Sequence, residues 1–209
     1  MDRLTICATI VSVSEARLER VLDAAYQCFT RHGVRKTTMD DIAAAAGMSR
    51  PAVYQYVRNR DDAFRRLAAR EYTAALVSAE AEAIGDGTLA QRLARVLLVR
   101  LDLVAGRDEA WAAELVAVSE DLEGAFLARL TDLLTATITE AAEDADLALG
   151  EENAREFAGL ALSLARGLET DPDHDRARER LRNGTALLVA GLAATVRPGG
   201  TRPRVATSV

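Results

Sequence analysis

The sequence has 209 residues, of which 49% are hydrophobic, and a formal net charge of -6 at pH 7. This length and apolar fraction exclude a disordered chain and allow one large domain or two small ones with a real core. Alanine and leucine dominate and β-branched runs are few, which favours an all-helical fold. Two cysteines without metal-ligand spacing exclude a disulfide framework, and no apolar run approaches the roughly 20 residues of a membrane span.

Charge is unevenly distributed along the chain. Residues 1–70 carry 12 basic and 8 acidic side chains, whereas residues 71–209 carry 14 basic and 24 acidic ones. A basic end on an acidic protein predicts that only this end meets a polyanion, although a chance fluctuation explains the difference equally well.

The first residues, MDRLTICATIVSV, are mostly apolar but lack a small-x-small cleavage site after them. We therefore expect residues 1–13 to be a poorly ordered leader of a cytoplasmic protein, or the product of a misassigned start codon. From Ser14, the expected N-cap, apolar residues at helical spacing predict a first helix that ends at His32-Gly33. A basic loop, VRKTT, follows it.

Two short helices with a sharp stop between them come next. The first is expected at 39–46, with two aspartates in its first turn that suit the positive end of the helix dipole. The second is expected to run from residue 50 to Asn59-Arg60. Each boundary carries a capping or breaking residue, namely Thr38, Gly47, Ser49 and Pro51. Helix, short turn with glycine and second helix together form the helix-turn-helix layout.

A long fourth helix is predicted from Asp61 to the break at Gly85-Asp86-Gly87. At 1.5 Å per residue it spans roughly 36 Å and joins the basic end to the acidic remainder as a rod. Further helices are expected at 88–105, 108–118, 120–145, 151–169 and 174–196. The predicted organisation is a DNA-binding helix-turn-helix domain at 14–60, a helical domain at 61–196 and a disordered tail at 197–209.

In a helix-turn-helix the second helix enters the major groove of DNA with its N-terminal half towards base edges. There Arg50 can offer a bidentate fork to guanine, Ala52 can contact a thymine methyl, and Gln55 can pair with adenine or reach phosphate. Hydroxyls and further cations nearby can position the helix on phosphates. The predicted DNA-contacting residues are Arg35, Lys36, Thr37, Thr38, Ser49, Arg50, Pro51, Ala52, Tyr54, Gln55, Tyr56 and Arg60. A plain helical hairpin with half-buried tyrosines is the alternative.

From about Arg17 to Tyr72 the chain resembles the DNA-binding domain of the TetR family of bacterial regulators. The stretch that carries the resemblance is VLDAAYQCFTRHGVRKTTMDDIAAAAGMSRPAVYQYVRNRDDAF. The resemblance implies that Tyr54 and Arg60 contact phosphate and that the positions of Arg50 and Gln55 often meet bases. The chain departs from the family pattern in having Arg60 for a usual lysine, Val57 for a common aromatic residue and Ala63 for a larger apolar one.

The same resemblance implies an Ω-like homodimer of all-helical subunits with a small-molecule pocket in the C-terminal half. Effector binding there is expected to shift the fourth helix and move the two DNA-reading heads apart. The candidate ligand-contacting residues are Tyr72, Leu76, Arg100, Trp111, Leu115 and Phe126. Each of them also fits an ordinary core. A buried Arg100 needs a partner, for which Glu114 or Asp102 is the candidate.

Apolar stripes with small residues on the last two expected helices predict the dimer interface. Its candidate residues are Phe157, Leu160, Ala161, Leu164, Leu168, Leu181, Leu188 and Leu192. The acidic segment DPDHDR between these helices has no metal-ligand spacing and is expected to be a solvated turn.

These patterns, together with what the resemblance implies, predict a ligand-responsive transcriptional regulator that binds a palindromic operator in double-stranded DNA as a homodimer. We expect no cofactor, no metal and no membrane partner. Repression is expected rather than activation only because most members of the resembling family are repressors. An enzyme is disfavoured because only His32 and His174 are present and no phosphate loop or catalytic pairing can be assembled. The remaining alternative is a helical small-molecule-binding or scaffold protein with a vestigial DNA-binding head.

Overall fold

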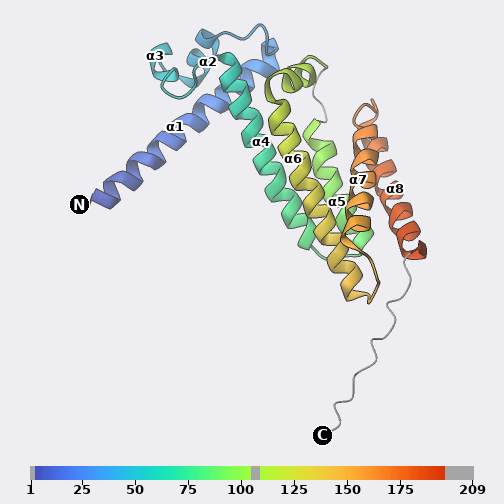
Figure 1. Cartoon of the computed structure of the whole chain (residues 1–209). Helices are drawn as coiled ribbons and strands as arrows, with labels where there is room; N and C mark the ends of the chain where they lie inside the picture. Colours follow the sequence, from blue (N-terminus) through green and yellow to red (C-terminus); the bar gives the residue numbers. More distant parts are fainter. Residues whose placement is uncertain (1–2, 105–108, 196–209) are drawn as a thin grey trace. The chain divides into compact units, whose positions relative to one another are not determined.

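The computed structural model describes residues 3–104 and 109–195, and all regular elements in these ranges are α-helices (Figure 1). The predicted all-helical fold is thereby confirmed. In chain order the helices are α1 (Arg3–His32), α2 (Met39–Ala46), α3 (Arg50–Val53), α4 (Arg60–Ile84), α5 (Leu89–Val104), α6 (Glu109–Asp144), α7 (Glu151–Leu168) and α8 (His174–Thr195).

The chain divides into two compact units. The first unit comprises Met1–Ala74 with Gly106–Ala125, and the second comprises Ala75–Ala105 with Phe126–Val209. Helices α4 and α6 therefore each contribute residues to both units. Each unit is described by itself below.

Helix boundaries differ from the expected ones at two places in the first unit. Helix α1 begins at Arg3, so Ser14 lies inside the helix and does not cap it. Helix α3 ends at Val53 and continues as a hydrogen-bonded turn through Tyr56, well before Asn59.

The two helices expected at 108–118 and 120–145 form one run, α6. Ser119 within it has φ -142° and ψ 29°, which are not helical angles, so α6 is kinked at this residue. The apolar periodicity correctly located the interruption. The periodicity did not predict that the helices on either side of Ser119 follow each other directly, without a loop between them.

Two glycines end the first two helices as their positions predicted. Gly33 and Gly47 have φ values of 79° and 63°, in the left-handed region where a Cβ is strained. The Gly47 N–H points to the Ala43 and Ala44 carbonyl oxygens, which closes α2. These reversals let α2 pack against both α1 and α3.

An aromatic cluster forms the centre of the first unit. The rings of Phe29 in α1 and Phe64 in α4 meet edge to face with centroids 5.4 Å apart. Trp111 in α6 lies edge to face on both, with centroids 5.1 Å from Phe64 and 6.3 Å from Phe29. All three side chains are buried, and each such aromatic pair adds about 0.5–1.5 kcal/mol beyond its area burial. The cluster joins α1, α4 and α6 in one core.

The start of α4 belongs to this same core. Phe64 and Leu67 are fully buried in it, which explains why the first unit extends past the expected boundary at residue 60. Val57 and Ala63, where the family pattern has larger side chains, are also buried in the hydrophobic core of this unit. Their smaller volumes are accommodated within the packed core.

The second unit packs α5 against α7 and α8, which also contact each other. Alanines on α7, including Ala158 and Ala165, are fully buried and permit close helix approach. Arg100 on α5 is buried, with Nε and Nη2 at 3.0 and 3.1 Å from the carboxylate oxygens of Glu169. Glu169 was not foreseen as its partner. Asp102 contacts Arg178 and His174, and Glu114 lies outside the described side chains.

Three features bear on other classes of function. No helix in the described ranges is long and apolar enough to span a membrane. Among the described side chains, His, Cys, Asp and Glu residues nowhere gather in threes as a metal site requires. Cys28 is buried in the first core, and burial raises the pKa of its thiol, so it packs as a small hydrophobic residue.

Replacement of Trp111 by alanine is expected to destabilise the first unit by about 3–5 kcal/mol, because it removes a buried ring from the core. Urea unfolding followed by circular dichroism measures the free energy of unfolding. Tyr26, which also contacts Trp111 but is 42% exposed, provides the control, and Tyr26→Ala should cost much less. Equally small losses in both variants would contradict the core position of Trp111.

Candidate nucleic-acid interface

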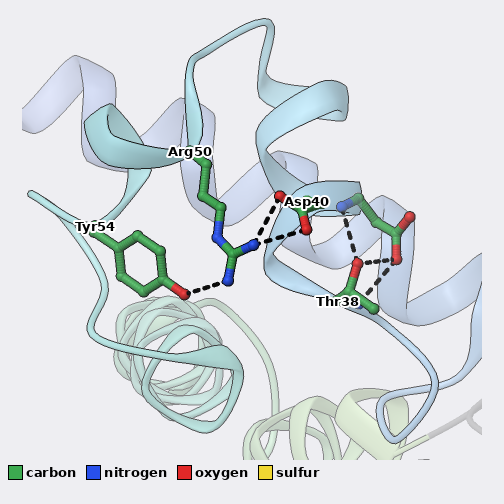
Figure 2. A network of polar contacts seen from close by, with 5 residues as sticks. Thr38, Asp40, Arg50 and Tyr54 are labelled. Carbon is green, nitrogen blue, oxygen red and sulfur yellow. Dashed lines mark hydrogen bonds and ion pairs between the residues drawn. The ribbon is translucent and has the colours of Figure 1, made fainter.

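The N-terminus of α2 is fixed by a reciprocal cap between Thr38 and Asp41 (Figure 2). The Thr38 N–H and hydroxyl donate to Asp41 Oδ2 at 2.9 and 2.7 Å, and the Asp41 N–H lies 3.2 Å from Thr38 Oγ1. The hydroxyl bond is the main cause that lowers the pKa of the Asp41 carboxyl. This capping box aligns the first turn of α2 and occupies the hydroxyl proton of an exposed threonine.

Thr37 has a different environment from its neighbour. Its side chain is buried, and its hydroxyl donates to the Gly33 carbonyl oxygen at 2.9 Å. A hydroxyl has only one proton, so the predicted donation from Thr37 to phosphate does not fit this structure. Arg35 and Lys36, in the same loop, are exposed as expected. The loop therefore offers cations to solvent and uses Thr37 to hold its own fold.

Helix α3 exposes the side predicted to face DNA. Its N-cap is Ser49, whose Oγ lies 3.4 Å from the Ala52 N–H. Val53 is fully buried in the core and anchors the opposite side of this short helix. The residues that remain exposed at its start and in the following turn are Ser49, Arg50, Pro51, Tyr54 and Gln55.

An exposed polar network links α2 to α3 (Figure 2). Arg50 Nη1 lies 2.9 and 3.3 Å from the two carboxylate oxygens of Asp40, and Nη2 donates to the Tyr54 hydroxyl at 3.3 Å. The Arg50 guanidinium carbon also lies 5.7 Å from the centroid of the Tyr54 ring. The Tyr54 hydrogen bond, followed by the charge of Asp40, raises the pKa of Arg50. Arg50 is thus oriented before any ligand arrives.

Asp40 was not foreseen as a member of this surface. A signal was present in the sequence: Asp41, three residues after Thr38, completes the capping box, which leaves Asp40 without a capping role. Its exposure and its contact with Arg50, ten residues later, required the fold.

The two tyrosines after α3 differ in exposure. Tyr54 is exposed, whereas Tyr56 is half-buried and packs against the hydrophobic core of the first unit. Tyr54 therefore remains a candidate DNA contact. The contact predicted for Tyr56 stays a prediction, for a side chain that also packs against the core.

The start of α4 carries cations with structural partners. Arg60 donates from Nη1 to the Arg35 carbonyl oxygen at 2.9 Å and pairs with Asp61 at 2.8 Å, so it joins α4 to the basic loop. Arg58 has an exposed side chain whose guanidinium contacts the buried Asp62 at 3.2 Å. Arg58 is a cation of this surface that the sequence patterns did not single out, although it stands two residues before Arg60.

The six candidate ligand-contacting residues divide between the two units. Tyr72 and Trp111 are buried in the first unit, and Trp111 makes core contacts there. Leu76 is half-buried in the second unit, where Arg100 and Phe126 are buried. Leu115 lies outside the described side chains. Their assembly into one ligand pocket stays a prediction.

The different placements of the threonines lead to a prediction for Thr37→Val. Loss of the buried hydrogen bond to Gly33 is expected to cost roughly 1 kcal/mol of stability. The DNA affinity of the folded variant should remain that of the wild type at each salt concentration, because the substitution removes no group that binds phosphate. Thermal unfolding and DNA titrations at several salt concentrations test both parts. Weaker DNA binding at every salt concentration, with unchanged stability, would assign the hydroxyl to phosphate.

Part of the chain that includes this surface matches known regulatory proteins in sequence. Residues 21–67 match the sequence profile described as bacterial regulatory proteins, tetR family. The chain is 39% identical over 67 residues to an HTH-type transcriptional repressor of Mycobacterium tuberculosis. These aligned residues make up 31% of this chain and 36% of that protein. It is 37% identical over 49 residues to a probable acrEF/envCD operon repressor of Escherichia coli, 23% of this chain and 22% of that protein. The matches thus span about a third or less of these relatives.

Solved structures resemble the chain over most of its length. The structure of a transcriptional regulator from Pseudomonas aeruginosa superposes with a TM-score of 0.68 at 18% identity. The match covers 87% of this chain and 92% of the Pseudomonas chain. SmeT, the repressor of a Stenotrophomonas maltophilia multidrug efflux pump, has a TM-score of 0.58 at 24% identity, with 88% and 95% covered. At these identities the likeness concerns the fold.

Proposed function

We propose that this chain, which belongs to the TetR family of bacterial regulatory proteins, is a transcriptional regulator whose α2–α3 surface binds double-stranded DNA. The observation that carries the proposal is the exposed start of α3, where Arg50, Tyr54 and Gln55 stand on a helix anchored from behind by Val53. Such an arrangement presents the guanidinium of Arg50 and the side-chain amide of Gln55 to base edges. Repressor activity is supported by the names of the Mycobacterium tuberculosis and Escherichia coli relatives.

Selection of bound sequences from random duplex DNA tests the proposal. A homodimer with two α3 helices should enrich a palindrome whose half-sites are one helical turn apart, or a multiple of it. A helical binding or scaffold protein with a vestigial head predicts no enrichment. Failure to enrich any sequence at low salt, where electrostatic binding is strongest, would contradict the proposal.

Arg50 and Arg60 are expected to differ in what they recognise. Arg50→Ala should cost about 1–3 kcal/mol per half-site and relax base preference at one symmetric pair of positions. Arg60→Ala should weaken binding to all sequences and lower the salt slope by about one for each phosphate that Arg60 binds. Affinities for a set of operator variants at several salt concentrations separate the two effects.

The control for both variants is Arg155→Ala in the second unit. Arg155 is as exposed as Arg50, with 52% and 53% of their side chains accessible, and it also pairs with an aspartate. It should alter neither base preference nor salt slope. If Arg60→Ala lost base preference, and Arg50→Ala lost the same affinity for every operator variant, the two assignments would be reversed.

We also propose a homodimer formed through α7 and α8. An apolar groove of about 640 Å³ runs along these helices, lined by Phe157, Leu160, Leu164, Gly184, Leu187, Leu188, Gly191, Leu192 and Thr195. Leu160 and Leu187 are 56% and 75% exposed, an unfavourable position for large apolar side chains in water. A second copy would cover this face and match it with the same face, as two-fold symmetry requires.

The predicted interface residues are only partly on this face. Phe157, Leu160, Leu164, Leu188 and Leu192 line the groove. Ala161 and Leu181 are fully buried within the unit, so their stripes serve the core. Leu168 is half-buried outside the groove lining, and the highly exposed Leu187 was not singled out. The helical stripes therefore did not separate the buried faces of α7 and α8 from the face that lines the groove.

The double variant Leu160→Glu with Leu187→Glu should be monomeric, because it places four charges in the proposed two-copy interface. Both side chains are exposed in the single chain, so the subunit fold should survive, as circular dichroism can verify. Val77→Glu, at an exposed apolar residue of α4 outside the groove, should remain dimeric. Sedimentation that shows an unchanged dimer in the double variant would exclude this interface.

Release of DNA by a small-molecule effector completes the proposal. It rests on the family and on the continuity of α4, which contributes residues to both units without a break between Arg60 and Ile84. A continuous helix can transmit a displacement from one unit to the other. Binding of an effector is expected to lower affinity for the selected DNA.

A further inference from the structure

Asp40 takes no part in the capping box of α2, and its place in the first turn adds only a favourable interaction with the helix dipole. The capping box is completed by Thr38 and Asp41, and the Asp40 side chain is exposed. Its ion pair with Arg50 lies at the surface, where such pairs add little to stability because water screens them. A carboxylate on a surface that is proposed to meet phosphates repels DNA. The contact of Asp40 with Arg50 therefore raises the question of an effect on binding.

Contacts to Arg50 leave part of its guanidinium available. The group has five N–H donors. Asp40 and Tyr54 together receive three hydrogen bonds from Nη1 and Nη2, so at least two N–H donors remain for a ligand. Two donors suffice for the O6 and N7 acceptors of guanine. Asp40 and Tyr54 can thus stay in place while Arg50 reads a base.

The ion pair also limits what else Arg50 can do. An unrestrained arginine at the start of α3 could turn towards any nearby phosphate and bind DNA regardless of sequence. With Asp40 on Nη1 and Tyr54 on Nη2, Arg50 is held from two sides (Figure 2). A phosphate that competes for Nη1 must approach the Asp40 carboxylate, which repels it.

We propose that Asp40 is a specificity-determining residue, which orients Arg50 towards base edges and opposes its pairing with DNA phosphates. The inference rests on the proposed function, since it assigns Asp40 a role on the same DNA-binding surface. It goes further in making an acidic residue of α2, rather than α3 alone, responsible for discrimination between sequences.

The test compares two duplexes: the sequence selected by the wild-type protein, and a shuffled duplex of equal length and composition. Asp40→Asn keeps the shape of the side chain and removes its charge. The ratio of affinities for the two duplexes should fall about threefold per half-site, as expected for loss of an exposed ion pair, and so about tenfold for two half-sites. Most of this change should come from tighter binding to the shuffled duplex.

Three variants separate this role from general effects of charge and folding. Asp121→Asn is the matched control: Asp121 lies in the same unit, pairs with Arg65 and is as exposed as Asp40, both at 66%. It should leave the ratio unchanged. Asp40→Glu, which restores the charge, should recover most of the discrimination. In the Arg50→Ala background, Asp40→Asn should have no further effect on the ratio.

Base preference provides a readout that a merely structural role would not move. Asp40→Asn should relax selection at the same symmetric positions as Arg50→Ala, with an unchanged melting temperature. Equal affinity ratios and preferences for Asp40→Asn, Asp121→Asn and wild type would overturn the inference. Absence of any sequence discrimination by the wild type would instead contradict the proposed function itself.

Discussion

Edge-to-face packing of Phe29, Phe64 and Trp111 is the contact on which the proposed DNA-binding surface depends. It brings helices from three separate parts of the sequence into one core. Helices α2 and α3, with 8 and 4 residues, are far too short to be stable alone in water. Their orientation therefore comes from the core beneath them and from the caps at their ends.

The surface above this core serves structure and recognition with the same groups. Thr38 caps α2, Thr37 closes the loop onto Gly33, and Arg60 ties that loop to α4. These bonds reduce the number of side chains that are free to contact DNA, but they position those that remain. Arg50 shows the same balance, because the partners that occupy part of its guanidinium also fix where the rest of it points.

Local features of the fold could be predicted from the sequence, whereas contacts between distant residues could not. The N-cap Thr38 and the C-cap Gly47 of α2 could be predicted from residue type and from their spacing along the chain. For Trp111 the sequence left a ligand pocket and an ordinary core position open, because periodicity places a residue on a helix face without naming the neighbour of that face. The contacts of Asp40 with Arg50 and of Arg100 with Glu169 join residues ten and 69 positions apart, which no local pattern encodes.

Hydrogen exchange with and without DNA tests most directly the claim that this surface binds DNA. Addition of a duplex selected by the protein should slow amide exchange in peptides that cover residues 35–60, where the loop, α2, α3 and the start of α4 present their N–H groups. Peptides from 151–195, which cover α7 and α8, should exchange at unchanged rates if the dimer is already formed. Slower exchange in the second unit alone, with residues 35–60 unaffected in the DNA-bound protein, would contradict the account.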